Sequence, residues 1–532
     1  MIHRVARRAS GMLLPFLEGP RGMAVMLGLA LLVLAGCGLP PPEGRPPSVA
    51  LAQEDARNTP LGQAVAGLSA RHPGLTGIHA LAEARDAFAA RVLLARAARK
   101  TLDVQYYIWH GDLTGTLLLD ELRAAAERGV RVRLLLDDNG TSGLDARLAA
   151  LHAHPGIEVR LFNPFAVRHP KWIGFLTDFS RANRRMHNKS FTADSQATIV
   201  GGRNVGDEYF GAAEGALFAD LDVLAIGAVV PEVAADFDRY WASLSSYPVD
   251  LILPPPDREQ LPALRAAAEE VTQSPAALRY VGAIRDLPSI RQLLDGELAL
   301  EWAPVRMVSD DPAKGLGRAA PEGLLTSQLA EILDTPEREL ELVSPYFVPA
   351  EAGTAFFAGL ARSGVRVRVL TNSLASTDVT AVHAGYARRR EDLLAAGVVL
   401  YELRRLGPGA GERNDSAGPF GSSGSSLHAK TFAVDRRRVF VGSFNFDPRS
   451  ANLNTELGFV IESPVLADAI RRAFDQAIPA TSYKAGLTAD GRLFWTENLD
   501  GSVVRHETEP QASLLQRLLV SVLMRLPIEW ML

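Results

Sequence analysis

The chain has 532 residues, of which 47% are hydrophobic and 22% charged, and its formal net charge at pH 7 is −5. This length exceeds one ordinary hydrophobic core and predicts two or three domains, and the composition excludes a disordered chain. The slightly acidic balance argues against a dedicated nucleic-acid-binding protein, which would carry an overall basic field.

Residues 1–36 are predicted to be a lipoprotein signal peptide. Arginines precede the apolar run MAVMLGLALLVLAGC, which is too short to be a convincing membrane span. The run ends in small residues before Cys37, the only cysteine, and resembles the lipobox in which such a cysteine is acylated. The alternative is a signal peptide without lipidation. We therefore expect a cell-envelope protein, lipid-anchored to the inner or outer membrane and facing the periplasm.

The body of the chain shows the same order of elements twice. Residues 37–60 are rich in proline and predict a flexible linker. Strand patterns at 101–110 and 340–349 are each followed by a helical pattern and a second strand, VRVRLLLDD or VRVRVLTNS. These βαβ units predict an α/β fold, with mainly parallel mixed sheets flanked by helices. We assign one domain to 61–262 and a similar one to 263–485.

Two later segments are predicted to lie beside the second domain. Residues 407–426 are rich in glycine and serine and predict a loop that leads into the second motif described below. Residues 486–532 predict a hairpin and an amphipathic helix, because Arg517, Ser521 and Arg525 recur at four-residue spacing among apolar residues. That helix could belong to the core or lie at a membrane surface.

Two segments repeat one arrangement of polar residues. RRMHNKSFTADSQATIVGGRN contains His187, Lys189, Asp194 and Asn204. LHAKTFAVDRRRVFVGSFN contains His428, Lys430, Asp435, Ser443 and Asn445. The two histidines are 241 residues apart, as are the two asparagines, so the motifs are in register within a duplication.

The spacing within each motif favours binding of an anion. Side chains two residues apart on a strand point to the same face, which places an imidazole beside an ammonium group. Such a pair is costly in a core, and a phosphate would compensate its charge. Glycines 201, 202 and 442 are expected to let the backbone approach a ligand, while Asn204, Asn445 and Ser443 would add neutral donors.

The two H-x-K-x4-D strings, each followed by Gly-Gly or Gly-Ser, one residue and Asn, resemble the phospholipase D superfamily. The segments DVQYYIWHGDLTG and LTNSLASTDVTAVHAGYARRR resemble its bacterial cardiolipin synthase C-type branch. The resemblance implies two domains related by a pseudo-twofold axis, one shared site, and a two-step exchange through a phosphohistidine. By this analogy His187 is the nucleophile and His428 the acid and base, although pseudo-symmetry leaves their order open.

The same resemblance implies roles for the remaining residues. Lys189 and Lys430, with the two asparagines, would hold the phosphoryl oxygens, so neither a metal nor another cofactor is expected. Asp194 and Asp435 are grouped with the catalytic motif, but we interpret them mainly as structural residues that hold a turn. Carboxylates in the strands that follow the motifs are predicted to orient the histidines. These are Asp220 and Glu456.

The function implied is that of a phosphatidyltransferase that makes cardiolipin by headgroup exchange between two phospholipids. Its expected partners are phospholipid substrates and a membrane surface, and nucleic acid is not expected. A hydrolase of the same superfamily, which would release phosphatidic acid, is the first alternative. A nucleic-acid phosphodiesterase and an inactive lipid-binding scaffold are ranked behind it.

Overall fold

The computed structural model describes residues 38–41, 45, 47–212, 218–257, 260–285, 292–293, 295, 297–333, 335–405, 426–499 and 501–532. The predicted signal peptide, Cys37 and nearly all of the glycine- and serine-rich segment lie outside these residues. Within them, every helix is too short or too polar to span a membrane.

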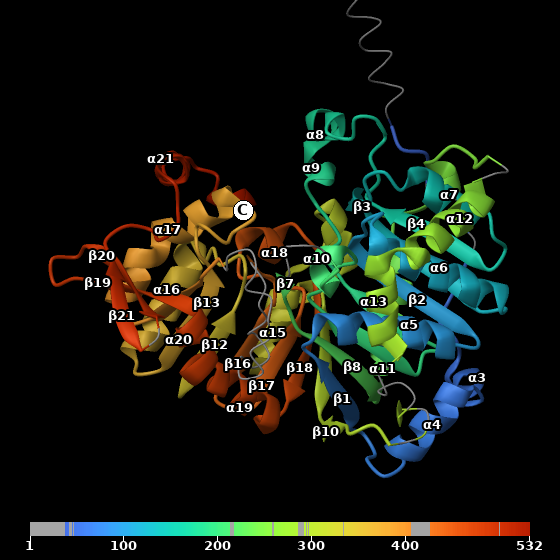
Figure 1. Ribbon diagram of the computed structural model, residues 1–532, viewed down its shortest axis with the longest axis horizontal. Helices are drawn as coiled ribbons and strands as arrows, with labels where there is room; N and C mark the ends of the chain where they lie inside the picture. Colours follow the sequence, from blue (N-terminus) through green and yellow to red (C-terminus); the bar gives the residue numbers. More distant parts are fainter. Residues whose placement is uncertain are drawn as a thin grey trace, which may run out of the picture.

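Each half of the molecule is built on one large sheet (Figure 1). The strands of the first sheet are β1 (Thr76–Leu81), β2 (Thr101–Ile108), β3 (Arg131–Gly140), β4 (Ile157–Phe162), β5 (Ser190–Ala193), β6 (Ala197–Gly201), β8 (Asp222–Gly227), β9 (Ser246–Pro248) and β10 (Glu301–Ala303). Those of the second are β11 (Val305–Ser309), β12 (Glu339–Val343), β13 (Arg366–Asn372), β14 (Val399–Leu403), β16 (Thr431–Val434), β17 (Arg438–Gly442), β18 (Leu457–Glu462), β19 (Ser482–Leu487), β20 (Leu493–Leu499) and β21 (Ser502–His506).

The strand orders confirm the α/β class and the duplication. They are β10-β1-β8-β6-β5-β2-β3-β4-β9 and β11-β18-β17-β16-β12-β13-β14-β19-β20-β21. Within the two large sheets, as far as the structure describes them, parallel pairing is confined to β2-β3-β4 and β12-β13-β14, and the other pairs are antiparallel. The expectation of mainly parallel sheets is therefore wrong. The strand after each motif turns back directly, without the long crossover that parallel pairing needs.

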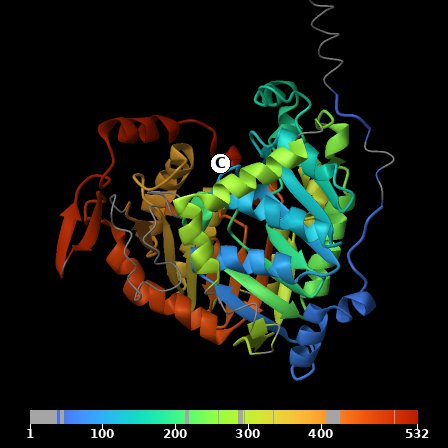
Figure 2. The same cartoon turned by 45° about the vertical axis from the view of Figure 1, so that its right-hand side comes forward.

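Helices cover the sheets (Figures 1 and 2). In the first half they are α3 (Gln53–Arg57), α4 (Pro60–Ser69), α5 (Ala84–Ala97), α6 (Leu113–Glu127), α7 (Asp145–His152), α8 (Ile173–Thr177), α9 (Phe179–Ala182), α10 (Asp207–Phe210), α11 (Val230–Ala242), α12 (Gln260–Gln273) and α13 (Pro275–Arg285). In the second they are α15 (Leu325–Leu333), α16 (Ala350–Arg362), α17 (Thr380–Ala395), α18 (Pro448–Asn452), α19 (Pro464–Arg472), α20 (Ile478–Thr481) and α21 (Leu514–Leu523). Short helical turns are η3 (Val249–Leu251), η4 (Pro312–Leu316), η5 (Pro321–Gly323), η6 (Ala473–Ala477) and η7 (Glu529–Met531).

The two βαβ units are β2-α6-β3 and β12-α16-β13. Each crossover helix ends at a glycine in the left-handed region, Gly129 with φ 91° and Gly364 with φ 95°. Only glycine adopts this conformation without a steric penalty, and it turns the chain back toward the sheet. These two positions therefore fix where the next strand begins in each half.

The boundary between the halves lies after β10 and not at 262–263. Strand β10 pairs with β1, in a register that places Trp302 opposite Gly77, so it belongs to the first sheet. Helix α12 packs on α6 and α7, and α13 on α5, where Tyr280 meets the ring of Phe88 at 5.1 Å. The predicted boundary is wrong because an amphipathic pattern shows that a helix has a buried face, but does not show which domain covers it.

Two other predicted segments are also tied to the body. Arg45 donates to the carbonyl of Ser243 at 2.5 Å, and the Ala50 N–H donates to Asp238 at 2.9 Å. Helix α3 then begins at Gln53, so the later part of the segment 37–60 is not a flexible linker. Strands β19 to β21 extend the edge of the second sheet, so the predicted C-terminal hairpin is continuous with the second domain.

The two halves share an apolar interface. Val200 and Val223 of the first sheet belong to the same buried cluster as Val441 and Phe459 of the second. Two short strands, β7 (Phe218–Ala219) and β15 (Ser426–Leu427), pair in parallel across this interface. Since β15 directly precedes His428, this pairing holds the second motif against the first half.

Candidate active site

Both motif histidines lie at the interface between the halves. His187 precedes β5 and His428 precedes β16. The backbone N–H of His187 donates to the Thr455 carbonyl, and that of His428 to the Ala219 carbonyl, each at 2.8 Å. Each motif is thus hydrogen-bonded to the opposite half, one residue before that half's predicted orienting carboxylate.

The two carboxylates are exchanged between the halves. His187 Nδ1 lies 2.9 Å from Glu456 Oε2, and His428 Nδ1 lies 2.6 Å from Asp220 Oδ2. Each histidine is therefore paired with the carboxylate of the other half. An Nδ1–H that donates to a carboxylate fixes the tautomer and leaves Nε2 for chemistry. The alignment of Asp220 with Glu456 was visible in the sequence, but the exchange was not.

Two buried ammonium groups accompany the histidines. Lys189 donates to the carbonyl of His187, and Lys430 donates to that of His428 and lies 2.9 Å from His428 Nδ1. Burial lowers the pKa of Lys430 to about 8 and lowers that of Lys189 well below its usual value. Among the described residues, neither ammonium forms an ion pair with a carboxylate. Desolvated cations without counterions favour binding of an anion.

The protonation of the two histidine–carboxylate pairs differs. Burial, with the charge of Lys430, lowers the pKa of His428 to about 4, and burial lowers that of His187 well below 6.5. Burial raises the pKa of Glu456 to about 7. Burial acts in the same direction on Asp220, but the hydrogen bond and charge of His428 outweigh it and lower the Asp220 pKa to about 2. At neutral pH Asp220 is therefore ionised, whereas Glu456 is divided between its two forms.

The predicted phosphate donors occupy three different environments. Asn204 accepts from the Ile108 N–H at 3.2 Å and donates to the Tyr209 hydroxyl at 3.1 Å, which leaves one amide N–H. Asn445 is 4% exposed, and its Oδ1 has no hydrogen-bond partner in the described part of the chain. The Ser443 hydroxyl donates to Glu456 at 2.5 Å, so it lies behind His187 and is not available to a phosphate.

The glycines beside the motifs make room for protein groups. A Cβ at Gly202 would lie 2.2 Å from Asp220 Oδ1, and one at Gly442 would lie 2.5 Å from the Leu457 carbonyl oxygen. Both distances are far below van der Waals contact. The absence of a side chain at Gly202 makes room for the Asp220 carboxylate, and that at Gly442 makes room for the neighbouring strand. The sequence had suggested that these glycines let the backbone approach a ligand.

Asp194 and Asp435 lie away from the histidines, at the far ends of β5 and β16. Asp194 accepts from the backbone N–H groups of residues 99–101, and Asp435 from those of residues 337–339. The prediction that groups them with the catalytic residues is therefore wrong, because neither carboxylate lies beside the histidines. The carboxylates hold the segment that enters β2 or β12, as the structural interpretation expected.

Two tyrosines contact the histidines and were missed as site residues. Tyr107 meets the ring of His187 edge to face at 5.0 Å, and Tyr209 meets His428 in the same way at 5.0 Å. Tyr107 stands in DVQYYIWHGDLTG, which was used above only as a signature of the family branch, and Tyr209 stands in DEYF, shortly after the first motif. The period-2 pattern of β2 could have placed Tyr107 on a face, but only the fold brings it to His187.

Two other features lie outside this histidine site. Ligand atoms of His110, Asp112 and Glu208 lie within 4.8 Å of one another, a grouping that the sequence did not reveal because Glu208 is distant in the chain. The group is internally satisfied, since His110 contacts Glu208 at 3.2 Å and Asp112 accepts from the backbone of α6 and α10.

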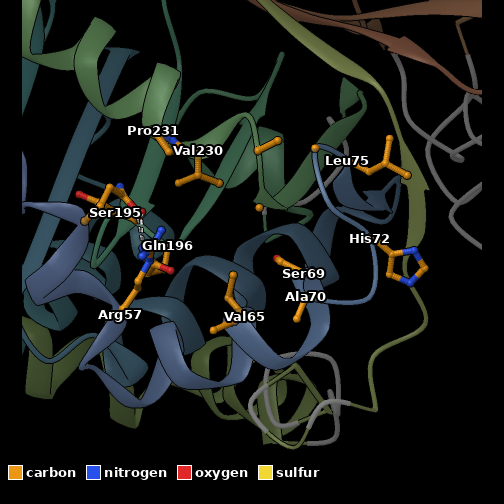
Figure 3. A pocket seen from close by; sticks show the side chains of 15 residues that line it. Arg57, Val65, Ser69, Ala70, His72, Leu75, Ser195, Gln196, Val230 and Pro231 are labelled. Carbon is orange, nitrogen blue, oxygen red and sulfur yellow. Dashed lines mark hydrogen bonds between the residues drawn. The ribbon is translucent and has the colours of Figure 1, made fainter.

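A cavity of about 490 Å³ lies between α3, α4 and the turn after β5. Figure 3 shows the side chains that line it, and neither motif histidine is among them.

Lys430 gives the site a predicted alkaline limit. With a pKa of about 8, its ammonium is charged below pH 8 and loses its proton as the pH rises through that value. We expect kcat/KM to fall above about pH 8, because the neutral amine no longer attracts a phosphate. The Lys430→Arg variant, if active, should lose this limb. A kcat/KM that stays flat to pH 10 in the wild-type chain would contradict the expectation.

Comparison with known proteins identifies the family of the chain. The family model described as "Cardiolipin synthase, PLD-like domain" matches residues 93–241 and 329–478. The chain is 49% identical over 472 residues to cardiolipin synthase C of Escherichia coli (strain K12), which covers 89% of this chain and 99% of that protein. It is 28% identical over 380 residues to cardiolipin synthase A of Pseudomonas syringae pv. syringae (strain B728a), or 71% of this chain and 63% of that protein.

A solved structure supports the fold. The phosphatidylserine synthase of Haemophilus influenzae Rd KW20 matches with a TM-score of 0.56 and 16% identity, covering 88% of this chain and 100% of that one. At this identity the likeness concerns architecture alone. With the family model matched in both halves and close identity along nearly the whole chain, this protein belongs to the phospholipase D superfamily, in its cardiolipin synthase C-type branch.

Proposed function

We propose that this chain is a phosphatidyltransferase that makes cardiolipin by exchanging the headgroup of one phospholipid for the headgroup alcohol of another. The observation that carries the proposal is the pair of crossed histidine–carboxylate contacts around two buried ammonium groups. That arrangement suits a phosphodiester, which supplies the missing negative charge and a phosphorus that two histidines can serve. Relatives named cardiolipin synthases support phospholipids as the class of substrate.

In the first step, Nε2 of His187 attacks the phosphorus of the donor lipid. The bond from phosphorus to the headgroup oxygen breaks, and His428 gives its Nε2 proton to the departing alcohol. The products are a phosphatidyl group on His187 and the free headgroup alcohol. Lys189 and Lys430 would hold the non-bridging oxygens, together with the amide N–H groups of Asn204 and Asn445.

The contrast between the two carboxylates supports the proposed order of the two histidines. A nucleophile must be neutral, and Glu456, with a pKa of about 7, is only partly ionised behind His187. An acid must carry a proton, and the ionised Asp220 stabilises imidazolium at His428. A bound phosphodiester would offset the two ammonium charges that now depress the His428 pKa. We therefore keep His187 as the nucleophile.

In the second step, a hydroxyl of the acceptor phospholipid gives its proton to His428 and attacks the same phosphorus. The bond from phosphorus to His187 breaks, which releases cardiolipin and restores both histidines. Water in place of the lipid alcohol would give phosphatidic acid. Transfer therefore requires a dry site and a high local concentration of acceptor.

The products distinguish the proposal from its alternatives. Purified chain is mixed with vesicles of radiolabelled phosphatidylglycerol, and cardiolipin, phosphatidic acid and released glycerol are measured over time, with and without EDTA. We expect cardiolipin to dominate and the rate to survive EDTA, since lysines and asparagines hold the phosphate. Phosphatidic acid as the main product would establish the hydrolase. A rate abolished by EDTA and restored by one divalent ion would contradict the metal-free site.

The proposed placement is the periplasmic face of a cell-envelope membrane, with a lipid anchor at Cys37. Its support is the lipobox-like sequence, and palmitate labelling of the wild-type and Cys37→Ala chains can test it.

A further inference from the structure

Helix α21 presents a broad apolar face to the solvent. Val520 is its buried residue, and it packs against Leu374, Ala384 and Ala387. The outward side chains are each 46–76% exposed. They are Leu514, Leu515, Leu518, Leu519 and Val522. This spacing places them along one side of a helix. The sequence left open whether this helix belongs to the core or lies at a membrane surface. Because its apolar face is exposed, the interpretation as a core helix is wrong for this face.

A second apolar group stands in the other half of the molecule. Trp172, Leu176 and Phe179 of the α8–α9 region are 60%, 74% and 46% exposed. Both views place α8 and α9 at the same end of the molecule as α21, at the top of Figures 1 and 2. We refer to these two groups together as the apolar end. Exposed clusters of this kind mark interaction sites.

The apolar end is connected to the active site. Arg449 of α18 donates to Asn183 Oδ1 at 2.7 Å, just after α9, and to the carbonyl of Met531 at 3.1 Å. It therefore ties the end of α9 to the C-terminal turn η7. The charge of Arg449 also reaches Tyr107, whose ring contacts His187. Arg449 thus joins both parts of the apolar end and lies close enough to Tyr107 to act on its charge.

Charge at this end favours an anionic surface. Arg517 and Arg525 stand on α21 and just after it, and neither forms an ion pair with a carboxylate in the described part of the chain. Lys171, beside the α8–α9 group, is paired with Asp138 at 3.0 Å. The acidic residues of these two segments are already paired: Asp178 with Arg181 at 2.6 Å, and Glu529 with Arg389 at 2.7 Å. Apolar side chains interleaved with basic ones are typical of segments that lie in the headgroup region of a bilayer.

We infer that the α8–α9 group and α21 form a two-part docking surface that inserts into a bilayer of anionic phospholipids. A planar surface can meet both groups at once, although they come from different halves. The inference rests on the proposed function in one respect: the same bilayer supplies both lipid substrates.

The test measures immersion at single positions of the full-length chain. Leu176→Cys and Leu518→Cys carry a nitroxide, and Val465→Cys, 66% exposed on α19 at the opposite end, is the matched control. All three are made in the His187→Ala background, so that no turnover is needed. Wild-type chain labelled in parallel gives the background from Cys37. Relaxation by oxygen and by a water-soluble nickel complex is compared with and without phosphatidylglycerol–phosphatidylethanolamine vesicles.

On addition of vesicles we expect positions 176 and 518 to gain accessibility to oxygen and lose it to nickel, and 465 to stay unchanged. If either position behaves like 465, the two-part surface is wrong. Spin–spin broadening at these positions without vesicles would assign the apolar end to a second copy of the chain and would also overturn the inference. A chain that inserts at both positions but makes no cardiolipin in its active form contradicts the proposed function alone.

A charged variant tests the consequence for activity. With Leu176→Glu and Leu518→Glu together, turnover of vesicle substrate should fall roughly tenfold or more, because two apolar anchors are lost. Turnover of short-chain lipid dispersed in detergent should stay within about twofold, as should both activities of Val465→Glu. An equal loss on both substrates would mean that the variant damages the fold, and the accessibility measurement then decides.

Discussion

Replacing either His187 or His428 with alanine should lower the rate of cardiolipin formation by roughly 10⁴-fold or more, while the fold stays intact. Each ring serves a step that the other cannot, since in the proposed mechanism His187 attacks phosphorus and His428 transfers the proton. A carboxylate from the opposite half fixes each ring in place, at 2.9 Å for His187 and 2.6 Å for His428. The measurement is the initial rate of label transfer between vesicle lipids, with thermal unfolding to confirm folding. His79→Ala, in β1 and outside the site, is the matched control and should be unaffected.

The intermediate gives this prediction a second readout. In His428→Ala the attack by His187 can proceed slowly, but the acceptor is no longer deprotonated. Intact mass under alkaline conditions should then detect a phosphatidyl adduct on the protein. An adduct on His428 in the His187→Ala chain would reverse the assignment, and near-wild-type activity in either variant would refute a two-histidine mechanism.

The parts of the site that could be predicted from sequence were those repeated within it. The equal spacing of 241 residues placed His187 with His428. Asp220 and Glu456 were matched by their place in the strand that follows each motif, where each is followed by leucine. The exchange of carboxylates could not be predicted, since it depends on how two sheets face each other. The sequence also placed β10, α13 and nearly all of α12 in the second domain, although the structure places them in the first half. A strand of three residues carries little pattern, and the pattern of a helix does not show which domain it packs against.

The two halves differ at one pair of equivalent positions beside the histidines, and this difference explains part of the site. Gly202 and Ser443 occupy equivalent places, yet glycine admits Asp220 closely, while the serine hydroxyl hydrogen-bonds to Glu456. The sequence suggested a phosphate donor at Ser443 because its hydroxyl is a neutral donor within the second motif. The structure assigns this pair to the support of the histidines. This difference between the halves accompanies the contrast in pKa between the two carboxylates.

That contrast predicts unequal effects for two conservative variants. Asp220→Asn keeps an oxygen that can accept from His428 Nδ1–H but removes the charge that stabilises imidazolium, so turnover should fall roughly 10²- to 10⁴-fold. Glu456→Gln should cost only about tenfold, because the neutral amide resembles the carboxyl form already present near pH 7 and the Ser443 carbonyl, 3.1 Å from His187 Nδ1, helps to hold the ring. Asp220→Glu and Glu456→Asp retain charge and serve as controls for geometry.

A substrate with a good leaving group separates orientation from proton donation. Phosphatidyl-p-nitrophenol needs no acid to depart, so the burst of nitrophenol that reports the first step should recover in Asp220→Asn to within about tenfold of wild type. Glu456→Gln should gain nothing from this substrate, since it affects the nucleophile. Recovery in Glu456→Gln in place of Asp220→Asn would make His428 the nucleophile. If neither variant recovers, both carboxylates act on ring orientation alone, and the charge of Asp220 has no part in the departure of the headgroup.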